Sequence, residues 1–358
     1  MTHSNWLVQQ NRLFHPMFFM PSLQRADGSR AAQSPSKRGL PSNKWPLKLL
    51  MAGSVLVTPF SYAEPQNATG LHGSVSLFTG IDGTNSVMNT ESPANLSDYS
   101  ASQDRQNEAV VIPFWDLNYR FSGASEVYFK TDIVGMASDF YTQAGYRYNL
   151  TDGSKLAIGV VPGLLEKEVW KNPYQLQSDR TTTKAAVQGI VLNYEQILGT
   201  DWSVELARGK YAIDQEESMT ALDRNSTLSY AELNYMTDLS ERWGFNWLIS
   251  YLDIDATGSA LKSKRVNTEA EFQLRNGRHI TMLASSVGLQ QFDDTNPIWD
   301  RTREDKKFGV AATYIYAAPF NWKRALFIAR GGWDVTDANI DFYDHDEYLV
   351  TLGMQYRF

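Results

Sequence analysis

Three histidines follow residue 63, namely His72, His279 and His345, and only His345 stands between acidic side chains. The tripeptide Asp344-His345-Asp346 could supply the Asp–His couple with which some hydrolases activate a nucleophile. Neighbouring residues on an extended strand point to opposite faces, however, so adjacency in sequence argues against such a couple. We therefore expect solvated loop charges here, assign no catalytic residue and predict no enzyme, with a surface enzyme around His345 as an alternative.

Acidic residues are concentrated in the same region of the chain. Asp337, Asp341, Asp344 and Asp346 could together present carboxylate oxygens to a calcium ion. They lack the spacing of an EF-hand loop, so a solvated acidic loop is the simpler explanation. The chain has no cysteine, which excludes disulfides, thiolate metal sites and cysteine nucleophiles. The sequence predicts neither a metal site nor a cofactor.

The segments that carry most of the polar residues alternate apolar and polar side chains, which is the two-residue period of β-strands. The last segment is the clearest, because every second residue from Tyr348 to Phe358 is apolar or aromatic. No segment after residue 63 offers 18 consecutive apolar residues, which excludes membrane-spanning helices there. Fourteen strands are predicted, at 71–81, 107–121, 125–134, 140–150, 154–163, 184–197, 202–213, 227–237, 243–254, 266–276, 279–289, 306–316, 324–335 and 346–358.

The connections between these strands alternate in length. Short turns, two of which contain Asp-Gly or Asn-Gly, favour tight hairpins. The longer connections are expected at 82–106, 135–139, 164–183, 214–226, 255–265, 290–305 and 336–345. A soluble sandwich would share the strand alternation, but this rhythm is typical of outer-membrane barrels with short periplasmic turns and long extracellular loops. We predict an all-β fold, a transmembrane antiparallel up-and-down barrel of about 14 strands, with 12 to 16 possible.

In such a barrel the apolar face of each strand meets lipid and the polar face lines the lumen. This assignment places charges of both signs inside, which a water-filled lumen tolerates better than a dry one. An interior plugged by its own Arg–Glu lattice is the alternative. The lumen-lining candidates are Asp116, Arg120, Lys130, Arg147, Glu232, Glu269, Glu271, Arg275 and Arg330.

An export signal precedes the barrel. Residues 44–63 combine a basic start, a short apolar run from Leu49 to Val57 and small residues at Ser61 and Ala63, which predicts cleavage after Ala63. Residues 1–43 are expected to be a spurious or disordered leader. Residues 1–63 hold seven of the 33 basic and one of the 40 acidic residues, so the remaining domain, 64–358, has a net charge of −13. That charge does not attract nucleic acid.

The closing strand, with Leu352, Met354, Tyr356 and Phe358 at alternate positions, resembles the last strand of bacterial outer-membrane proteins. The resemblance implies that the barrel assembly machinery and periplasmic chaperones recognise this end. With the segment Gly70–Gly80 and an Asn/Ser-rich first loop, the chain is also similar to an uncharacterised family, a domain of unknown function, of outer-membrane barrels from marine gammaproteobacteria. The family has no assigned activity, so the resemblance implies fold and location only.

The charged inner face favours a porin-like channel for small hydrophilic solutes, narrowed or gated by loops 82–106 and 164–183. A non-conducting structural or adhesive barrel is a further alternative. We expect a monomer in the outer membrane, in contact with lipid and lipopolysaccharide.

Overall fold

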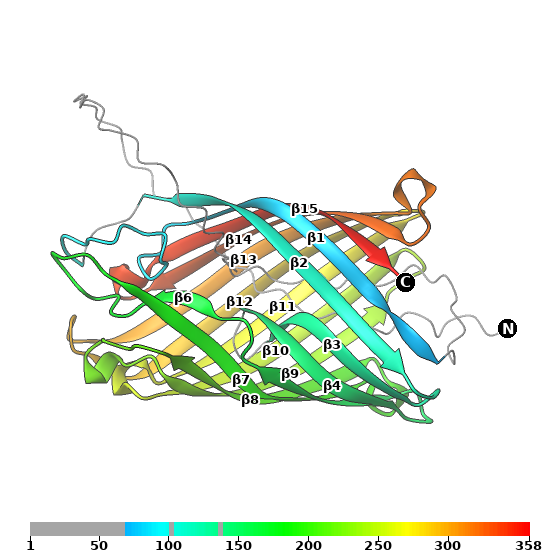
Figure 1. Cartoon of the computed structure of the whole chain (residues 1–358), viewed down its shortest axis with the longest axis horizontal. Helices are drawn as coiled ribbons and strands as arrows, with labels where there is room; N and C mark the ends of the chain where they lie inside the picture. The colour runs from blue at the N-terminus through cyan, green and yellow to red at the C-terminus, as the bar shows by residue number, and fades with distance from the viewer. Residues whose placement is uncertain (1–68, 100–103, 135–138) are drawn as a thin grey trace.

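The computed structural model describes residues 69–99, 104–134 and 139–358 of the 358-residue chain, and in these residues strands dominate (Figure 1). The leader and signal predicted at 1–63 lie outside the described residues. None of the helical turns in the described part is long and apolar enough to cross a membrane. The strands are β1 (Gly70–Thr84), β2 (Gln106–Arg120), β3 (Ser125–Val134), β4 (Asp139–Asn149), β5 (Lys155–Pro162), β6 (Lys167–Trp170), β7 (Thr182–Glu195), β8 (Trp202–Ile213), β9 (Ser226–Asp238), β10 (Trp243–Ala256), β11 (Ser263–Asn276), β12 (His279–Asn296), β13 (Arg301–Ala317), β14 (Ala325–Ala338) and β15 (His345–Arg357).

Fourteen of these strands form one closed antiparallel barrel. Each strand pairs with its neighbour in sequence, β5 pairs with β7, and β15 pairs with β1 from Ser74↔Arg357 to Thr84↔Glu347. Closure supplies a ladder partner to the first and last strands and removes the open edge that a flat sheet would expose. The predicted up-and-down barrel of fourteen strands is therefore confirmed. The short strand β6, which was not predicted, pairs with the first residues of β7 and is not one of the fourteen strands of the barrel.

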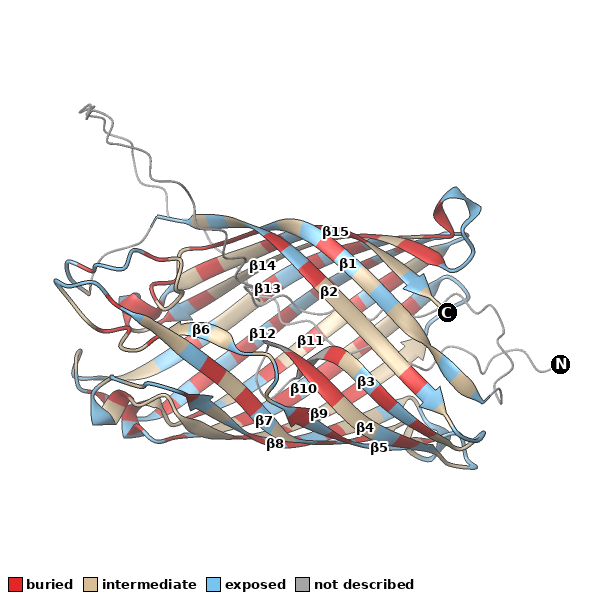
Figure 2. Ribbon diagram, in the orientation of Figure 1, coloured by how far each residue is buried: buried red, intermediate tan, exposed pale blue. Residues whose placement is uncertain are grey.

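The two faces of the barrel wall differ in exposure, as the banded ribbon of Figure 2 shows. On β12, Met282 is 3% exposed whereas its neighbour Leu283 is 58% exposed, and the alternation continues along the strand. The same pattern on β15 exposes Val350 and Leu352 and buries Thr351. An exposed apolar face that runs around a closed barrel is the surface that hydrocarbon chains solvate.

The turns gather at one end of the barrel and the loops at the other (Figure 1). Asn276 pairs with His279, so a two-residue turn with Gly277 at φ +60° joins β11 to β12. Five single-turn 3-10 helices lie in the connections: η1 (Ile197–Gly199), η2 (Thr220–Leu222), η3 (Ser259–Leu261), η4 (Pro319–Asn321) and η5 (Asp341–Tyr343). Of these, η1 and η4 belong to the turn end, and the others to the loop end.

One predicted loop is wrong. The residues 290–305 mostly continue β12 and β13, which still pair at Thr295↔Thr302 beyond an irregularity after Gln291. Their polar composition predicted a loop, but the part of a strand that projects beyond the lipid is in contact with water, so its outward side chains can be polar. Ladder hydrogen bonds and a contact from the Asp293 amide to the Lys262 carbonyl (2.9 Å or less) support the extension.

Close packing inside the wall depends on glycine at a few positions. Gly353 lies opposite Phe78 in the β1–β15 ladder, and an added Cβ would lie 2.3 Å from the Phe78 ring. The aromatic ring therefore covers the glycine backbone, an arrangement that stabilises glycine within strands.

Candidate functional site: a charged inner wall beneath a capped mouth

The nine lumen-lining candidates all lie on the wall face opposite the exposed apolar residues. Glu269 and Glu271, for example, alternate with Val266 and Phe272, which are 47% and 48% exposed. Strand alternation alone produces this placement, because residues two apart share a face. The inner face therefore carries charges of both signs, and what differs between the candidates is which side chains they contact.

Four candidates gather near the turn end of β2, β3 and β4, around Glu126. Arg120 donates to the Glu126 carboxylate at 3.1 and 3.3 Å, and Arg147 donates to its other oxygen. His72 lies 3.6 Å from the same carboxylate. Two inward positions further along the strands, Asp116 and Lys130 are direct register partners. Glu126 thus holds two arginines, which orders this part of the inner wall.

A second group lies across β9, β11 and β14. Glu269 is close enough to Glu271, Glu232 and Arg330 for direct charge–charge interactions. Arg275 is not part of this group, because it donates to Asp238 at 2.8 Å near the turn end. The structure therefore separates the nine candidates into two clusters and one peripheral arginine.

Apolar side chains also line part of the inner face, which the sequence analysis did not expect. Phe78, Ile112, Ile280, Ile315 and Ile328 belong to one buried cluster that spans β1, β2 and β12–β14. They share the inward parity of their strands, so assigning every apolar residue to lipid was wrong at these positions. The inner wall is amphipathic, with an apolar sector beside the charged one.

At the loop end of the barrel, residues of several loops pack into one compact cluster, which we name the cap. Its buried residues include Val87, Leu96, Tyr174, Leu222, Ala260, Ala338, Ile340, Phe342 and Tyr343. Trp299 packs against it, with ring centroids 5.0 Å from Phe342 and 5.5 Å from Tyr343. Six connections between strands contribute, so the cap joins loops that are far apart in sequence. Its aromatic packing contributes stability beyond simple burial.

Arg180 fastens the loop after β1 to the loop before β7. Its guanidinium donates to the backbone carbonyls of Val87 (2.8 Å), Pro93 (2.7 Å) and Pro173 (3.2 Å) and to the Ser92 hydroxyl (2.7 Å). The same group lies 4.2 Å from the centre of the Trp170 ring. Arg180 is 3% exposed, and burial lowers its pKa to about 10, so it stays charged at neutral pH.

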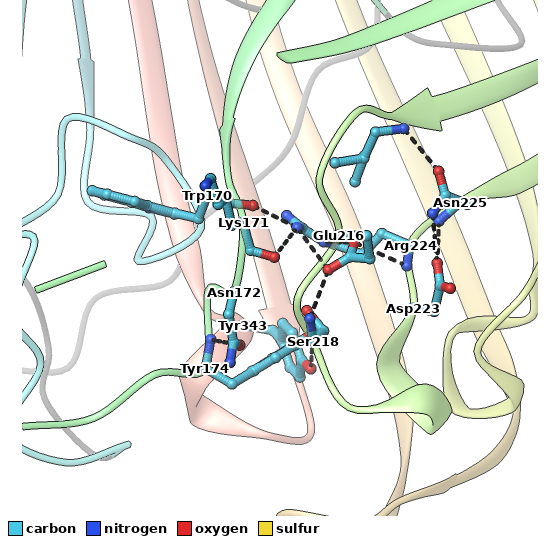
Figure 3. A network of polar contacts seen from close by, with 11 residues as sticks. Trp170, Lys171, Asn172, Tyr174, Glu216, Ser218, Asp223, Arg224, Asn225 and Tyr343 are labelled. Atoms are coloured by element: carbon cyan, nitrogen blue, oxygen red, sulfur yellow. Dashed lines mark hydrogen bonds and ion pairs between the residues drawn. The ribbon is translucent and has the colours of Figure 1, made fainter. Parts of the chain in front are cut away.

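A second arginine, Arg224, fastens the loop after β8 to the loop after β6 (Figure 3). It makes two hydrogen bonds to Glu216, at 2.7 and 3.1 Å, and also donates to the carbonyls of Trp170 and Lys171. Burial alone would raise the pKa of Glu216, but hydrogen bonds from Arg224 and Ser218 outweigh burial and hold that pKa below its ordinary value. The pair is therefore charged at neutral pH.

Two tyrosines connect these loops to the connection between β14 and β15. The Tyr343 hydroxyl donates to the Tyr174 hydroxyl at 3.0 Å and accepts from Asn296 at 3.0 Å. Arg303 lies 3.7 Å from the centre of the Tyr343 ring and binds Asp305 through two 2.7 Å hydrogen bonds. Burial raises the pKa of the Tyr174 phenol, which therefore stays protonated. No periodic pattern marks the cap residues in the sequence, and the aromatic residues of its loops are the signal that could have indicated it.

The residues around His345 do not form an Asp–His couple. His345 contacts the Tyr343 carbonyl at 2.9 Å and Thr336 at 3.4 Å. Asp344 instead accepts from the Ala338 amide at 2.6 Å, and Asp346 pairs with Arg105 and Trp333. The expectation of solvated charges is also wrong for Asp346, which is 8% exposed. These acidic side chains anchor the ends of β14 and β15.

No group of three or more His, Asp or Glu side chains is arranged to hold a metal ion in the part of the chain that the structure describes. Asp344 and Asp346, two of the four aspartates considered for calcium, are engaged by protein groups.

The fold and the site define a closed membrane-type barrel with a charged inner wall and a capped mouth. The chain belongs to the family described as Protein of unknown function (DUF2860), whose model matches residues 70–357. None of the curated proteins compared with this chain matches it.

Solved outer-membrane barrels have a similar fold at low sequence identity. A loop-deletion mutant of OmpT, an outer membrane protein of Vibrio cholerae, is 12% identical with a TM-score of 0.40, covering 82% of this chain and 100% of that one. An anion-selective porin from Comamonas acidovorans is 10% identical with a TM-score of 0.40 and the same coverage. The CymD monoaromatic hydrocarbon channel is 8% identical with a TM-score of 0.41, covering 81% and 89%.

Proposed function

We propose that this protein is a porin-like channel for small hydrophilic solutes, with the cap acting as its gate. The observation that carries the proposal is the inner wall, where Glu126, Lys130, Glu269 and Arg330 present charges of both signs on the face away from lipid. Charged side chains on an inner face are stable when water or a polar solute can reach them, and they are costly in a dry interior. A fourteen-stranded barrel is wider than the eight-stranded barrels whose interior side chains alone can fill.

The cap determines when solutes could pass. Arg180 and Arg224 are the fastenings that hold its loops together, and both act through polar contacts that a modest change in conformation can break. The predicted gating loops, 82–106 and 164–183, are the two that Arg180 joins. We propose that the cap limits conductance in its packed state and that release of either arginine widens the passage.

We place this channel in the bacterial outer membrane, as a monomer in contact with lipid and lipopolysaccharide. Export would depend on the signal at residues 44–63, with cleavage after Ala63. Assembly would depend on the closing strand, where Leu352, Met354, Tyr356 and Phe358 form the end recognised by the barrel assembly machinery and chaperones. The Phe358 amide and carbonyl bond Gly73 at 3.1 and 3.2 Å, so the same residue completes the seam between the chain ends.

Single-channel recording in planar bilayers tests the proposal. Purified barrel should produce discrete conductance steps, and Glu269→Gln with Glu271→Gln should shift ion selectivity toward anions, because two negative charges leave the inner wall. A folded barrel that never conducts would remove the channel hypothesis. Gln355→Glu adds a negative charge on the inner face of β15 and should shift selectivity in the opposite direction.

The packed cap favours one competing function, a non-conducting surface barrel whose loops bind an external partner. Its aromatic residues, including Trp299 and Tyr99, come from several loops and form one rigid unit. In that case no loop variant would increase conductance, including those that release Arg180.

A further inference from the structure

Part of the inner wall between β11 and β14 is built from small residues. Register partners across β11, β12, β13 and β14 define two neighbouring rows of inward residues. The first row is Glu269, Ser286, Gly309 and Asp334, and the second is Glu271, Ala284, Ala311 and Gly332. Both rows therefore start with a glutamate on β11 and cross two small residues. We name this region the β12–β13 recess.

The wall of the recess would accept further atoms next to Gly332. An added Cβ on Gly332 would meet only the Ala311 Cβ at 3.7 Å and the Val310 carbonyl at 3.8 Å. Neighbouring strands lie about 4.8 Å apart, so three spacings separate the β11 and β14 backbones by roughly 14 Å along the wall. Between these two borders the rows carry only serine, alanine and glycine, so no large side chain of β12 or β13 projects between the carboxylates of β11 and the charged side chains of β14. That spacing is too wide for one metal ion, whose ligands lie about 2.0–2.6 Å away.

Two polar groups at this recess lack partners although they are buried. Glu269 is 4% exposed and its Oε2 atom has no hydrogen-bond partner, while Thr313, on the next inward position of β13, is 1% exposed and its hydroxyl has none. Buried polar atoms without partners are costly to the folded state, so their presence points to a ligand that satisfies them.

The charge balance at the recess sets the chemistry of that ligand. Arg330 interacts with Asp334, Glu269 and Glu271, so one cation serves three carboxylates. Glu232 adds a further negative charge near Glu269, and Lys307 and Glu347 add one charge of each sign near Asp334. Counted with every carboxyl group ionised, the surplus is negative. We propose that the β12–β13 recess binds a small solute that carries ammonium or guanidinium groups, with Glu269 and Glu271 as its main partners. The inference rests on the proposed function, because the lumen must admit the solute.

Isothermal titration calorimetry on the folded barrel, purified in a nonionic detergent, tests this site without requiring conduction. Cadaverine, a five-carbon diamine, is the probe, and 1,5-pentanediol is its uncharged counterpart. We expect saturable binding of cadaverine only. Glu269→Gln combined with Glu271→Gln should weaken it about tenfold or more, since charge-assisted hydrogen bonds contribute about 1.5–3 kcal/mol each.

A steric pair of variants separates the recess from general electrostatics. Gly332→Val fills the recess without altering charge and should abolish cadaverine binding. Gly331→Val, on the adjacent residue of the opposite face, should leave binding unchanged, because a Cβ there meets only Val350 at 3.9 Å. Equal binding by both glycine variants, or no saturable binding by wild-type barrel, would overturn the site. A barrel that conducts but does not bind cadaverine loses only this site, whereas one that binds but never conducts loses the channel.

Discussion

Removing Arg180 should release the loop after β1 from the loop before β7. The side chain makes four hydrogen bonds of 3.2 Å or less, three of them to backbone carbonyls. Arg180→Ala would remove the donor to the Pro93 and Pro173 carbonyls, whereas the Val87 carbonyl would keep only its hydrogen bond from the Ser92 hydroxyl. Losing a buried, multiply bonded charged group costs about 3–5 kcal/mol. At about 1.4 kcal/mol per tenfold change, local opening of the cap would become at least a hundredfold more frequent.

Amide hydrogen exchange measures that opening. The amides of residues 86–96 and 174–180 should lose protection in Arg180→Ala while the ladder of β12 and β13 keeps it, because the barrel wall does not depend on the cap. Arg180→Lys should fail to restore protection, since one ammonium cannot reach acceptors arranged for a planar guanidinium. Lys184→Ala is the matched control, because the Lys184 side chain is 64% exposed and its ion pair with Glu166 lies at the surface. Unchanged protection in Arg180→Ala would refute the assignment of Arg180 as the main fastening of the cap.

Three further predictions concern the second fastening, the lipid face and the chain end. The pKa of Glu216 lies below its ordinary value of about 4.3, so the pairing of Glu216 with Arg224 stabilises the cap above that pH and is lost as pH falls through the lowered pKa. The protection of cap amides from hydrogen exchange should therefore decline in acid below about pH 4. Glu216→Gln should show the same loss of protection at neutral pH. An acid-resistant wild-type cap with a normal Glu216→Gln cap would contradict this. Val350→Lys should destabilise the folded barrel by about 2–4 kcal/mol in denaturant titrations in lipid vesicles, because Val350 faces lipid. Gln355→Lys, on the inner face of the same strand, should change the free energy of unfolding little. Equal destabilisation by the two variants would mean that the two faces are assigned wrongly. Deleting Phe358 should slow barrel assembly in vesicles more than Phe320→Ala does, although Phe320 is the more exposed ring, since only Phe358 pairs with Gly73.

Strand alternation and connection length were enough to predict the barrel and its fourteen strands. A two-residue period specifies the face of each side chain, so the inward placement of Glu269 or Arg147 required no tertiary information. The strands predicted at β12 and β13 were too short, because residues beyond the lipid still form the ladder hydrogen bonds but are polar and no longer alternate with apolar residues. The inward cluster around Ile280 and Ile328 was missed for a related reason, since composition cannot reveal that both faces of a strand segment are apolar.

The cap lay beyond sequence reasoning for a different reason. Arg180 binds carbonyls of residues 87 and 93, and Tyr343 binds Tyr174, so each contact joins positions about 90 or more residues apart. Loops have no sequence period from which such contact partners could be predicted. Backbone carbonyls are present in every residue, so they do not identify the residue that accepts the hydrogen bond. The β12–β13 recess likewise depends on strand register, which places glutamates of β11 and the small residues of β12 and β13 in common rows.

From the cap and the charged inner wall together, we propose that this barrel conducts small solutes and that its loops control the passage. Single-channel recording of wild type and Arg180→Ala, matched for folded content by hydrogen exchange of the β12–β13 ladder, tests it most directly. We expect discrete conductance steps in both proteins, larger or more frequent in Arg180→Ala. Folded barrels that remain silent in both forms would contradict it.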